Sequence, residues 1–202
     1  MMNDTSDLIC DGVHSQYPVS MLLRNIGLDA ASFCGRFLDV GCGRDARLVR
    51  YLRARGIQAY GIDPTVEGTE PYLIKQCASD ISQPDRYYDL VVSHYAHFKD
   101  GMESNKRVVI AIGGERCFSE NYSSSMKPPM MKTVREAVRL LKPGCRFVIW
   151  PEPRYLLEES RQEILDLGAE ISVEEVTPII FEELKGNIPF DEFCNRAVLT
   201  KR

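Results

Sequence analysis

Two aspartates and two glycines in one short stretch of the chain have the spacing of a nucleotide-binding site. Gly41 and Gly43 follow an apolar run, and residues without a Cβ let a turn adopt positive φ and bring its backbone N–H groups close to a ligand. Asp39 comes just before this turn, and Asp63 lies twenty residues beyond Gly43. A carboxylate at that distance in a βαβ unit can accept hydrogen bonds from both hydroxyls of a ribose. The spacing therefore predicts a ligand with an unphosphorylated ribose.

The position of Asp39 indicates what else the ligand carries. In a dinucleotide site the residues just before the glycines lie against a pyrophosphate, which a carboxylate would repel. A ligand with an ammonium group suits Asp39 better. A nicotinamide dehydrogenase, which uses G-x-G-x-x-G on the same kind of unit, is therefore disfavoured.

Histidines supply the candidates for acid–base chemistry. The chain has three, and two of them, His94 and His97, follow a later apolar run. Imidazole titrates near neutrality, so either could take a proton from a substrate. A polar histidine that only shapes a cleft is the open alternative. Glu152 and His14 are further candidate bases.

The apolar pattern predicts the elements that position these residues. Residues 37–40 and 60–62 have the character of buried strands, and a helical period between them predicts an amphipathic crossover helix. The apolar positions of this helix are Leu48, Val49 and Leu52, and its solvent-facing arginines are Arg47, Arg50 and Arg53. Gly56 supplies a left-handed stop. The order is strand, glycine turn, helix, strand and acidic tip.

This segment resembles the class I S-adenosylmethionine-dependent methyltransferases. In that family the first strand ends in an acidic residue followed by x-G-x-G, and the second strand ends in another acidic residue; here these are Asp39-Val40-Gly41-Cys42-Gly43 and Asp63. The resemblance implies S-adenosylmethionine as the cofactor. The contacts that it implies in this unit come from Asp39, Gly41, Cys42, Gly43, Asp63 and Pro64. Cys42 is expected to be a small packing group and not a nucleophile.

The resemblance continues along the chain. Residues 73–78 look like the third strand, after which Asp80 would take the adenine amino group and the N–H of Ile81 would meet the ring. Residues 88–94 look like the fourth strand, with Ser93 at the cofactor and the substrate side beginning at its carboxyl end. Residues 140–149 resemble a helix end, a Pro-Gly turn and the fifth strand.

The carboxyl-terminal part distinguishes this fold from a dehydrogenase. A helix over 155–167 ending at Gly168, then strands over 170–176 and 196–200, predict an antiparallel hairpin. The implied fold is α/β: a Rossmann-like, seven-stranded, mostly parallel sheet with an antiparallel carboxyl-terminal hairpin and helices on both faces.

Two departures from the family pattern stand out. Asp45 occupies the place of a common third glycine, and we expect it to point outward, offset by Arg44 or a backbone amide. Residues 101–132 form an insertion, with a possible strand over 107–112 and a loop rich in Ser, Pro and Met over 119–131. This loop suits either a lid or a plain surface excursion.

Composition limits the other possibilities. The 202 residues, 44% of them hydrophobic, fit a single domain over 1–202 with an amino-terminal cap segment over 1–35. A helix over 19–26 would either cover the cofactor cleft or be an ordinary leading helix. The net charge of −4 argues against nucleic-acid and anionic-membrane partners.

Seven cysteines show no metal-finger spacing, and no signal peptide is evident, so a soluble cytoplasmic protein without metal is expected. The function that the resemblance implies is methyl transfer to a small-molecule acceptor at oxygen, nitrogen or sulfur. A catalytically silent S-adenosylmethionine-binding module that works through a protein partner is the alternative.

Overall fold

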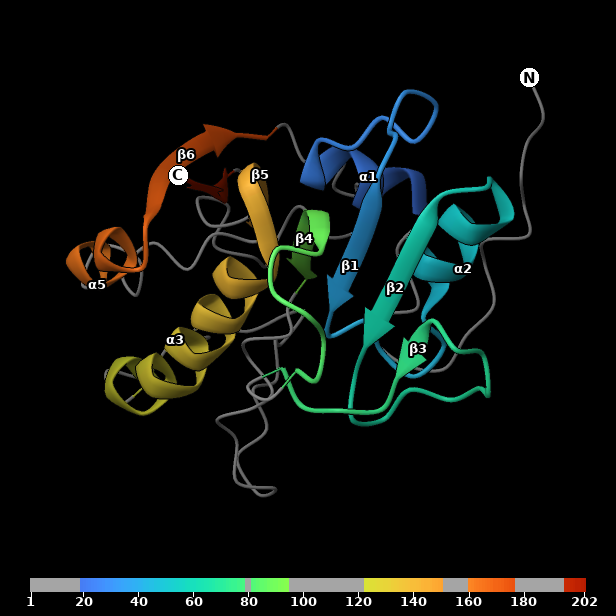
Figure 1. The fold of residues 1–202 in the computed structure, drawn as a ribbon, viewed down its shortest axis with the longest axis horizontal. Coiled ribbons are helices and arrows are strands. Elements are labelled where there is room, and N and C mark those ends of the chain that lie inside the picture. Colours follow the sequence, from blue (N-terminus) through green and yellow to red (C-terminus); the bar gives the residue numbers. More distant parts are fainter. Residues whose placement is uncertain (1–18, 79–80, 95–121, 151–159, 177–194) are drawn as a thin grey trace, which may run out of the picture.

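The computed structural model describes residues 19–78, 81–94, 122–150, 160–176 and 195–202 (Figure 1). Its elements, in chain order, are α1 (Val19–Ile26), β1 (Arg36–Val40), α2 (Arg47–Ala54), β2 (Gln58–Ile62), β3 (Leu73–Ile74), β4 (Tyr88–His94), α3 (Tyr122–Leu140), β5 (Leu141–Trp150), α5 (Arg161–Asp166), β6 (Ala169–Glu175) and β7 (Asn195–Lys201). Within the described ranges, no helix has both the length and the apolar character needed to cross a bilayer.

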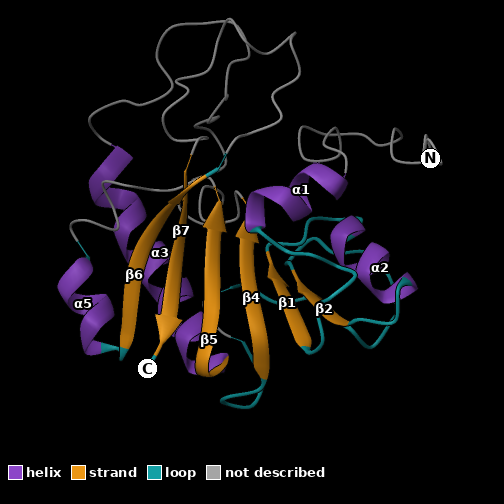
Figure 2. Cartoon of the chain, turned by 90° about the horizontal axis from the view of Figure 1, so that it is seen from above, coloured by secondary structure: helices purple, strands orange, loops and turns teal. Residues whose placement is uncertain are grey.

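The seven strands that the structure describes form one sheet in the order β3-β2-β1-β4-β5-β7-β6. The pairs from β3 to β5 are parallel, whereas β7 runs antiparallel to both β5 and β6. The carboxyl ends of β1, β2, β4 and β5 therefore meet at one edge of the sheet (Figure 2). The predicted fold class and its carboxyl-terminal hairpin are confirmed.

Helices cover both faces of the sheet because its strands are apolar on both sides. One core cluster joins strand residues such as Leu38 and Val91 to α3 and α5. The other joins Phe37 and Val92 to α1 and α2. Neighbouring strand residues belong to opposite clusters, as the period of two in a β-strand requires.

Helix α2 has the predicted form. Its apolar residues Leu48, Val49 and Leu52 are buried, and Gly56 ends the turn that follows it with a φ of 82°. Arg53 departs from the prediction, because its guanidinium donates to the carbonyl oxygen of Ala59 at 2.6 Å and covers the ring of Tyr60. This arginine is therefore part of the packing between α2 and β2.

Helix α1 lies over the predicted residues. Val19, Leu23 and Ile26 are buried in the cluster that also contains Leu52 of α2 and Val148 of β5. The described helix thus packs on the sheet face beside α2, as an ordinary leading helix would. Residues 1–18, including His14, lie outside the described residues, so the cap segment and the single domain over 1–202 remain predictions.

Two predicted strands differ in their limits. The third, expected over 73–78, is only Leu73–Ile74, because the chain bends at Gln76, whose side chain accepts hydrogen bonds from Ser82. The Pro-Gly turn before the fifth strand lies inside β5, where the pairing with β4 shifts register. Gly144 still has the positive φ of a turn, 77°.

The prediction of a loop over 119–131 is wrong from residue 122 onward, because α3 begins at Tyr122. Proline lacks an N–H and disfavours a helix interior, which is why the two prolines in this segment predicted a loop. Further along the same helix, Met131, Val134 and Val138 are buried on one face against the sheet. Burial of this face stabilises the helix despite the prolines. The possible strand over 107–112 lies outside the described residues.

The carboxyl-terminal helix is described from Arg161 to Asp166, and Gly168 follows it with a φ of 77°. The part expected over 155–159 lies outside the described residues. Strands β6 and β7 then pair over their whole lengths, from Ala169 opposite Lys201 to Glu175 opposite Asn195.

Candidate cofactor site

The carboxylate of Asp63 ties the glycine turn to the end of β2. Its Oδ2 accepts the N–H of Gly43 at 3.0 Å, and its Oδ1 accepts the N–H and the hydroxyl of Thr65 at 2.8 and 2.6 Å. Asp63 is 5% exposed, and Pro64 after it is exposed. Among the described residues, only Gly43 donates to Oδ2. Because each carboxylate oxygen has about two acceptor positions, these contacts leave one on Oδ2 for a ligand hydroxyl.

The N–H groups of the glycine turn are used inside the protein. Those of Gly41 and Cys42 both donate to the carbonyl oxygen of Ile62, at 2.7 and 3.2 Å, and that of Gly43 donates to Asp63. Because the turn folds back onto β2, these three N–H groups donate within the protein. The expected contact between this turn and a ligand stays a prediction. A ligand can still lie close to the backbone of this turn.

Gly43 leaves that approach open. Its φ is 73°, and a Cβ built on it would meet no atom within 4 Å. Gly61, by contrast, makes room for a neighbour, since its Cβ would lie 2.8 Å from Sγ of Cys42. Burial, followed by the charges of Asp39 and Asp63, raises the pKa of the Cys42 thiol. The side chain is thus a protonated packing group, as expected.

Asp39 is a buried carboxyl group beside this turn. It lies in β1 between Gly61 of β2 and Val92 of β4, and it is 3% exposed. Burial, with a smaller contribution from the charge of Asp63, raises its pKa to about 7. A cationic group bound next to it would favour the ionised form. The site therefore has an electrostatic preference for a positive ligand.

Asp45, which stands in place of the common third glycine, is a surface residue. The residue is exposed, as expected, and its carbonyl oxygen accepts a hydrogen bond from Nε of Arg50 at 3.0 Å. Arg44 does not offset it: the guanidinium of Arg44 pairs instead with Glu67 at 3.5 Å.

The end of β4 places Ser93 and His94 at the same sheet edge. Ser93 is 1% exposed, lies between Val40 of β1 and Ile149 of β5, and its hydroxyl has no hydrogen-bond partner among the residues described. The backbone of His94 pairs with Trp150. The direction of the His94 side chain, and the whole of His97, lie outside what the structure describes.

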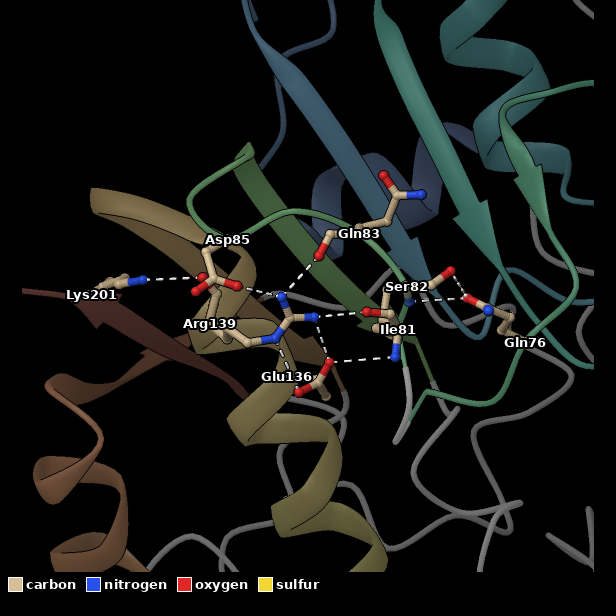
Figure 3. Close-up of polar contacts among 8 residues, drawn as sticks. All are labelled: Gln76, Ile81, Ser82, Gln83, Asp85, Glu136, Arg139 and Lys201. Atoms are coloured by element: carbon tan, nitrogen blue, oxygen red, sulfur yellow. Dashed lines mark hydrogen bonds and ion pairs between the residues drawn. The ribbon is translucent and has the colours of Figure 1, made fainter.

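Helix α3 holds the segment between β3 and β4 in place, a tertiary contact that was not predicted from the sequence. The N–H of Ile81 donates to Oε2 of Glu136 at 3.4 Å, and the carbonyl oxygen of Ile81 accepts from Nη2 of Arg139 at 2.7 Å (Figure 3). The only available signal was the i, i+3 spacing of an acid and a base on a helix. Asp80 and Glu152 lie outside the described residues.

Among the residues that the structure covers, no group of three or more His, Cys, Asp or Glu side chains could hold a metal ion. Four cysteines in these ranges, Cys34, Cys42, Cys77 and Cys145, carry free thiols.

Residues 19–108 match a family model described as a methyltransferase domain. No curated protein matches the sequence. Several solved structures are similar to the chain. A TehB-like SAM-dependent methyltransferase from Corynebacterium glutamicum is 21% identical, with coverage of 90% of this chain and 93% of that one and a TM-score of 0.47.

The YcgJ protein of Bacillus subtilis is 16% identical, with coverage of 91% and 98% and a TM-score of 0.46. A phosphoethanolamine N-methyltransferase 2 from Haemonchus contortus, in complex with phosphomonomethylethanolamine and S-adenosylhomocysteine, is 14% identical, with coverage of 91% and 52% and a TM-score of 0.49.

The raised pKa of Asp39 predicts that the Asp39→Asn variant is more stable than the wild type in the absence of ligand. Because the folded-state pKa lies near 7, above the ordinary 3.8, the carboxyl group stabilises the fold at low pH and loses this contribution as the pH rises through 7. At pH 8 we expect a gain of about 1–3 kcal/mol, shrinking as the pH falls toward 4. Urea unfolding at several pH values measures it.

Asp45→Asn, which changes an exposed carboxylate near the same turn, is the matched control and should give no gain. If the free energies of unfolding of the wild type and Asp39→Asn depended on pH in the same way, the raised pKa of Asp39 would be contradicted.

Proposed function

We propose that the chain transfers a methyl group from S-adenosylmethionine to a small-molecule acceptor, because residues 19–108 match a family model described as a methyltransferase domain. The family match and the strand order confirm the resemblance to the class I enzymes. S-adenosylmethionine is the cofactor that the family indicates.

One observation carries the cofactor placement: the buried pair Asp39 and Asp63 on either side of a turn whose N–H groups are already used. A pyrophosphate needs free N–H donors, and these three N–H groups are not free. A sulfonium ligand with an ammonium needs acceptors and negative charge, which Asp39 supplies. In this placement a ribose hydroxyl takes the remaining acceptor position on Asp63.

The remaining cofactor contacts follow the sheet edge. Gly41, Cys42 and Gly43 would approach the cofactor through backbone, with Pro64 beside the ribose. Ile81 would lie at the adenine ring, with Asp80 before it. Ser93, whose buried hydroxyl lies at the end of β4, would be close to the reacting methyl group.

The reaction places a few demands on the residues of the chain. Methyl transfer moves a carbon from a sulfonium, a good leaving group, to an acceptor atom held in line about 3 Å away. A hydroxyl or acidic N–H acceptor also gives up a proton, for which His94 or His97 is the proposed base. Glu152 and His14 are the alternatives if neither histidine faces the acceptor.

Ligand titration tests the proposal. We expect S-adenosylhomocysteine to bind and NAD to bind weakly or not at all, because the carboxylate of Asp39 repels a pyrophosphate. Isothermal titration of the whole chain with both ligands measures this. Tight NAD binding without a response to S-adenosylhomocysteine would overturn the cofactor placement.

Two glycine variants separate backbone strain from loss of the ligand contact. Gly43→Ala and Gly56→Ala both force a Cβ onto a left-handed residue, with φ of 73° and 82° and open space around it, so each should cost about 1–2 kcal/mol of stability. Only Gly43 lies against the proposed cofactor, so only Gly43→Ala should also weaken S-adenosylhomocysteine binding, by about tenfold or more. Urea unfolding and titration give the two readouts. Equal affinities of the two variants would show that the ligand does not approach Gly43.

Replacing the proposed base should affect turnover and spare the cofactor. His94→Asn or His97→Asn should lower the rate by roughly 10²-fold or more and remove the rise of rate with pH through the imidazole pKa. Titration with S-adenosylhomocysteine on the same variants is the control. A raised KM with an unchanged pH profile would mean that the histidine only shapes the cleft.

A further inference from the structure

The guanidinium of Arg139 joins helix α3 to the segment that leads from β3 into β4. Its Nη2 donates to the carbonyl oxygen of Ile81 at 2.7 Å, and its Nη1 donates to that of Gln83 at 2.8 Å and pairs with Asp85 (Figure 3). Arginine suits this task because its planar fork can serve several acceptors at once.

Glu136, one turn earlier on the same helix, completes the arrangement. Its carboxylate pairs with Arg139 at 2.7 Å and accepts the N–H of Ile81 at 3.4 Å. Helix α3 thus holds Ile81 from both sides, at its N–H and at its carbonyl group. Ile81 as a whole is 4% exposed, and it belongs to the core cluster that contains Val134 and Val138 of α3.

The two hydrogen bonds to Ile81 differ in how easily they are exchanged. The bond from its N–H to Glu136 is long, at 3.4 Å, so another acceptor can replace it at small cost. The bond from Arg139 is short, charge-assisted and supported by the neighbouring contacts to Gln83 and Asp85. The backbone at Ile81 would therefore stay in place while its N–H changes partner.

Building on the proposed function, we propose that Arg139 is a positioning residue for adenine recognition. It fixes the peptide of Ile81 so that the N–H, released by Glu136, donates to N1 of the adenine ring. Arg139 does not touch the cofactor in this arrangement. It sets the position of the donor that does.

A ligand without the N1 acceptor tests this directly. In the 1-deaza analogue of S-adenosylhomocysteine a C–H group replaces N1, and the ribose, the amino group and the amino acid are unchanged. We expect the wild type to bind S-adenosylhomocysteine about tenfold more tightly than this analogue, the scale of one hydrogen bond in a buried site. Isothermal titration of the whole chain measures both affinities.

In Arg139→Gln the preference should collapse, because affinity for S-adenosylhomocysteine falls about tenfold and affinity for the analogue barely changes. Arg139→Lys keeps the charge but not the fork, so it should restore part of the preference. Arg135→Gln is the matched control: Arg135 lies on the same helix, is exposed and pairs with Glu163 of α5 instead of the β3–β4 segment. It should behave as the wild type.

The outcomes separate this proposal from the proposed function. A wild type that does not bind S-adenosylhomocysteine overturns both. A wild type that binds it, with Arg139→Gln keeping the preference or losing affinity for both ligands equally, overturns only the positioning role, as does a wild type without any preference. If Arg139→Gln shows no cooperative unfolding, Arg139→Lys takes its place. A preference for S-adenosylhomocysteine over the analogue as large as that of the wild type would then overturn the positioning role, and a smaller preference would support it.

Discussion

The candidate site depends on the hydrogen bonds that the Asp63 carboxylate accepts. One of its oxygens holds the N–H of Gly43 and the other holds the backbone and hydroxyl of Thr65. The turn after β1 and the turn after β2 are thereby fixed to the same side chain. A carboxylate is well suited here because it only accepts hydrogen bonds and has room for about four of them. The same group can therefore organise the turn and also bind a ligand hydroxyl.

The arrangement has an electrostatic cost. Asp39 is buried near Asp63, so desolvation and like charge both oppose its ionisation, and its pKa rises to about 7. A fold selected only for stability would place an apolar side chain at this point of β1. Retention of a buried carboxyl group beside another one fits a site that gains its compensating charge from a ligand. The buried carboxyl group thus lowers the stability of the fold while it raises the affinity of the site for a cation.

Much of the fold could be predicted from the sequence because the local signals agree with the packing. The apolar runs of β1, β2 and β4, the helical period of α2 and the left-handed glycines at 56 and 168 each act over a few residues. The start of α3 could not be predicted from local signals. The two prolines near its start disfavour a helix, but burial of the later part of the same helix against the sheet stabilises it. The candidate site shows the same division. Asp39 and Asp63 were identified from spacing, whereas the internal use of the N–H groups of Gly41 and Cys42, and the hold of Arg139 on Ile81, follow from tertiary contacts between segments distant in sequence.

The place of β7 in the sheet has a consequence for the order in which the chain can fold. This strand is the last of those described, yet it lies between β5 and β6 and pairs with both. During synthesis β5 therefore presents an open edge, and β6 has no partner, until residues 195–201 have emerged. Exposed strand edges invite pairing with other chains. Strand β6 carries Glu170, Glu174 and Glu175 beside the exposed Val173. These negative charges would disfavour pairing with other chains before β7 has been synthesised.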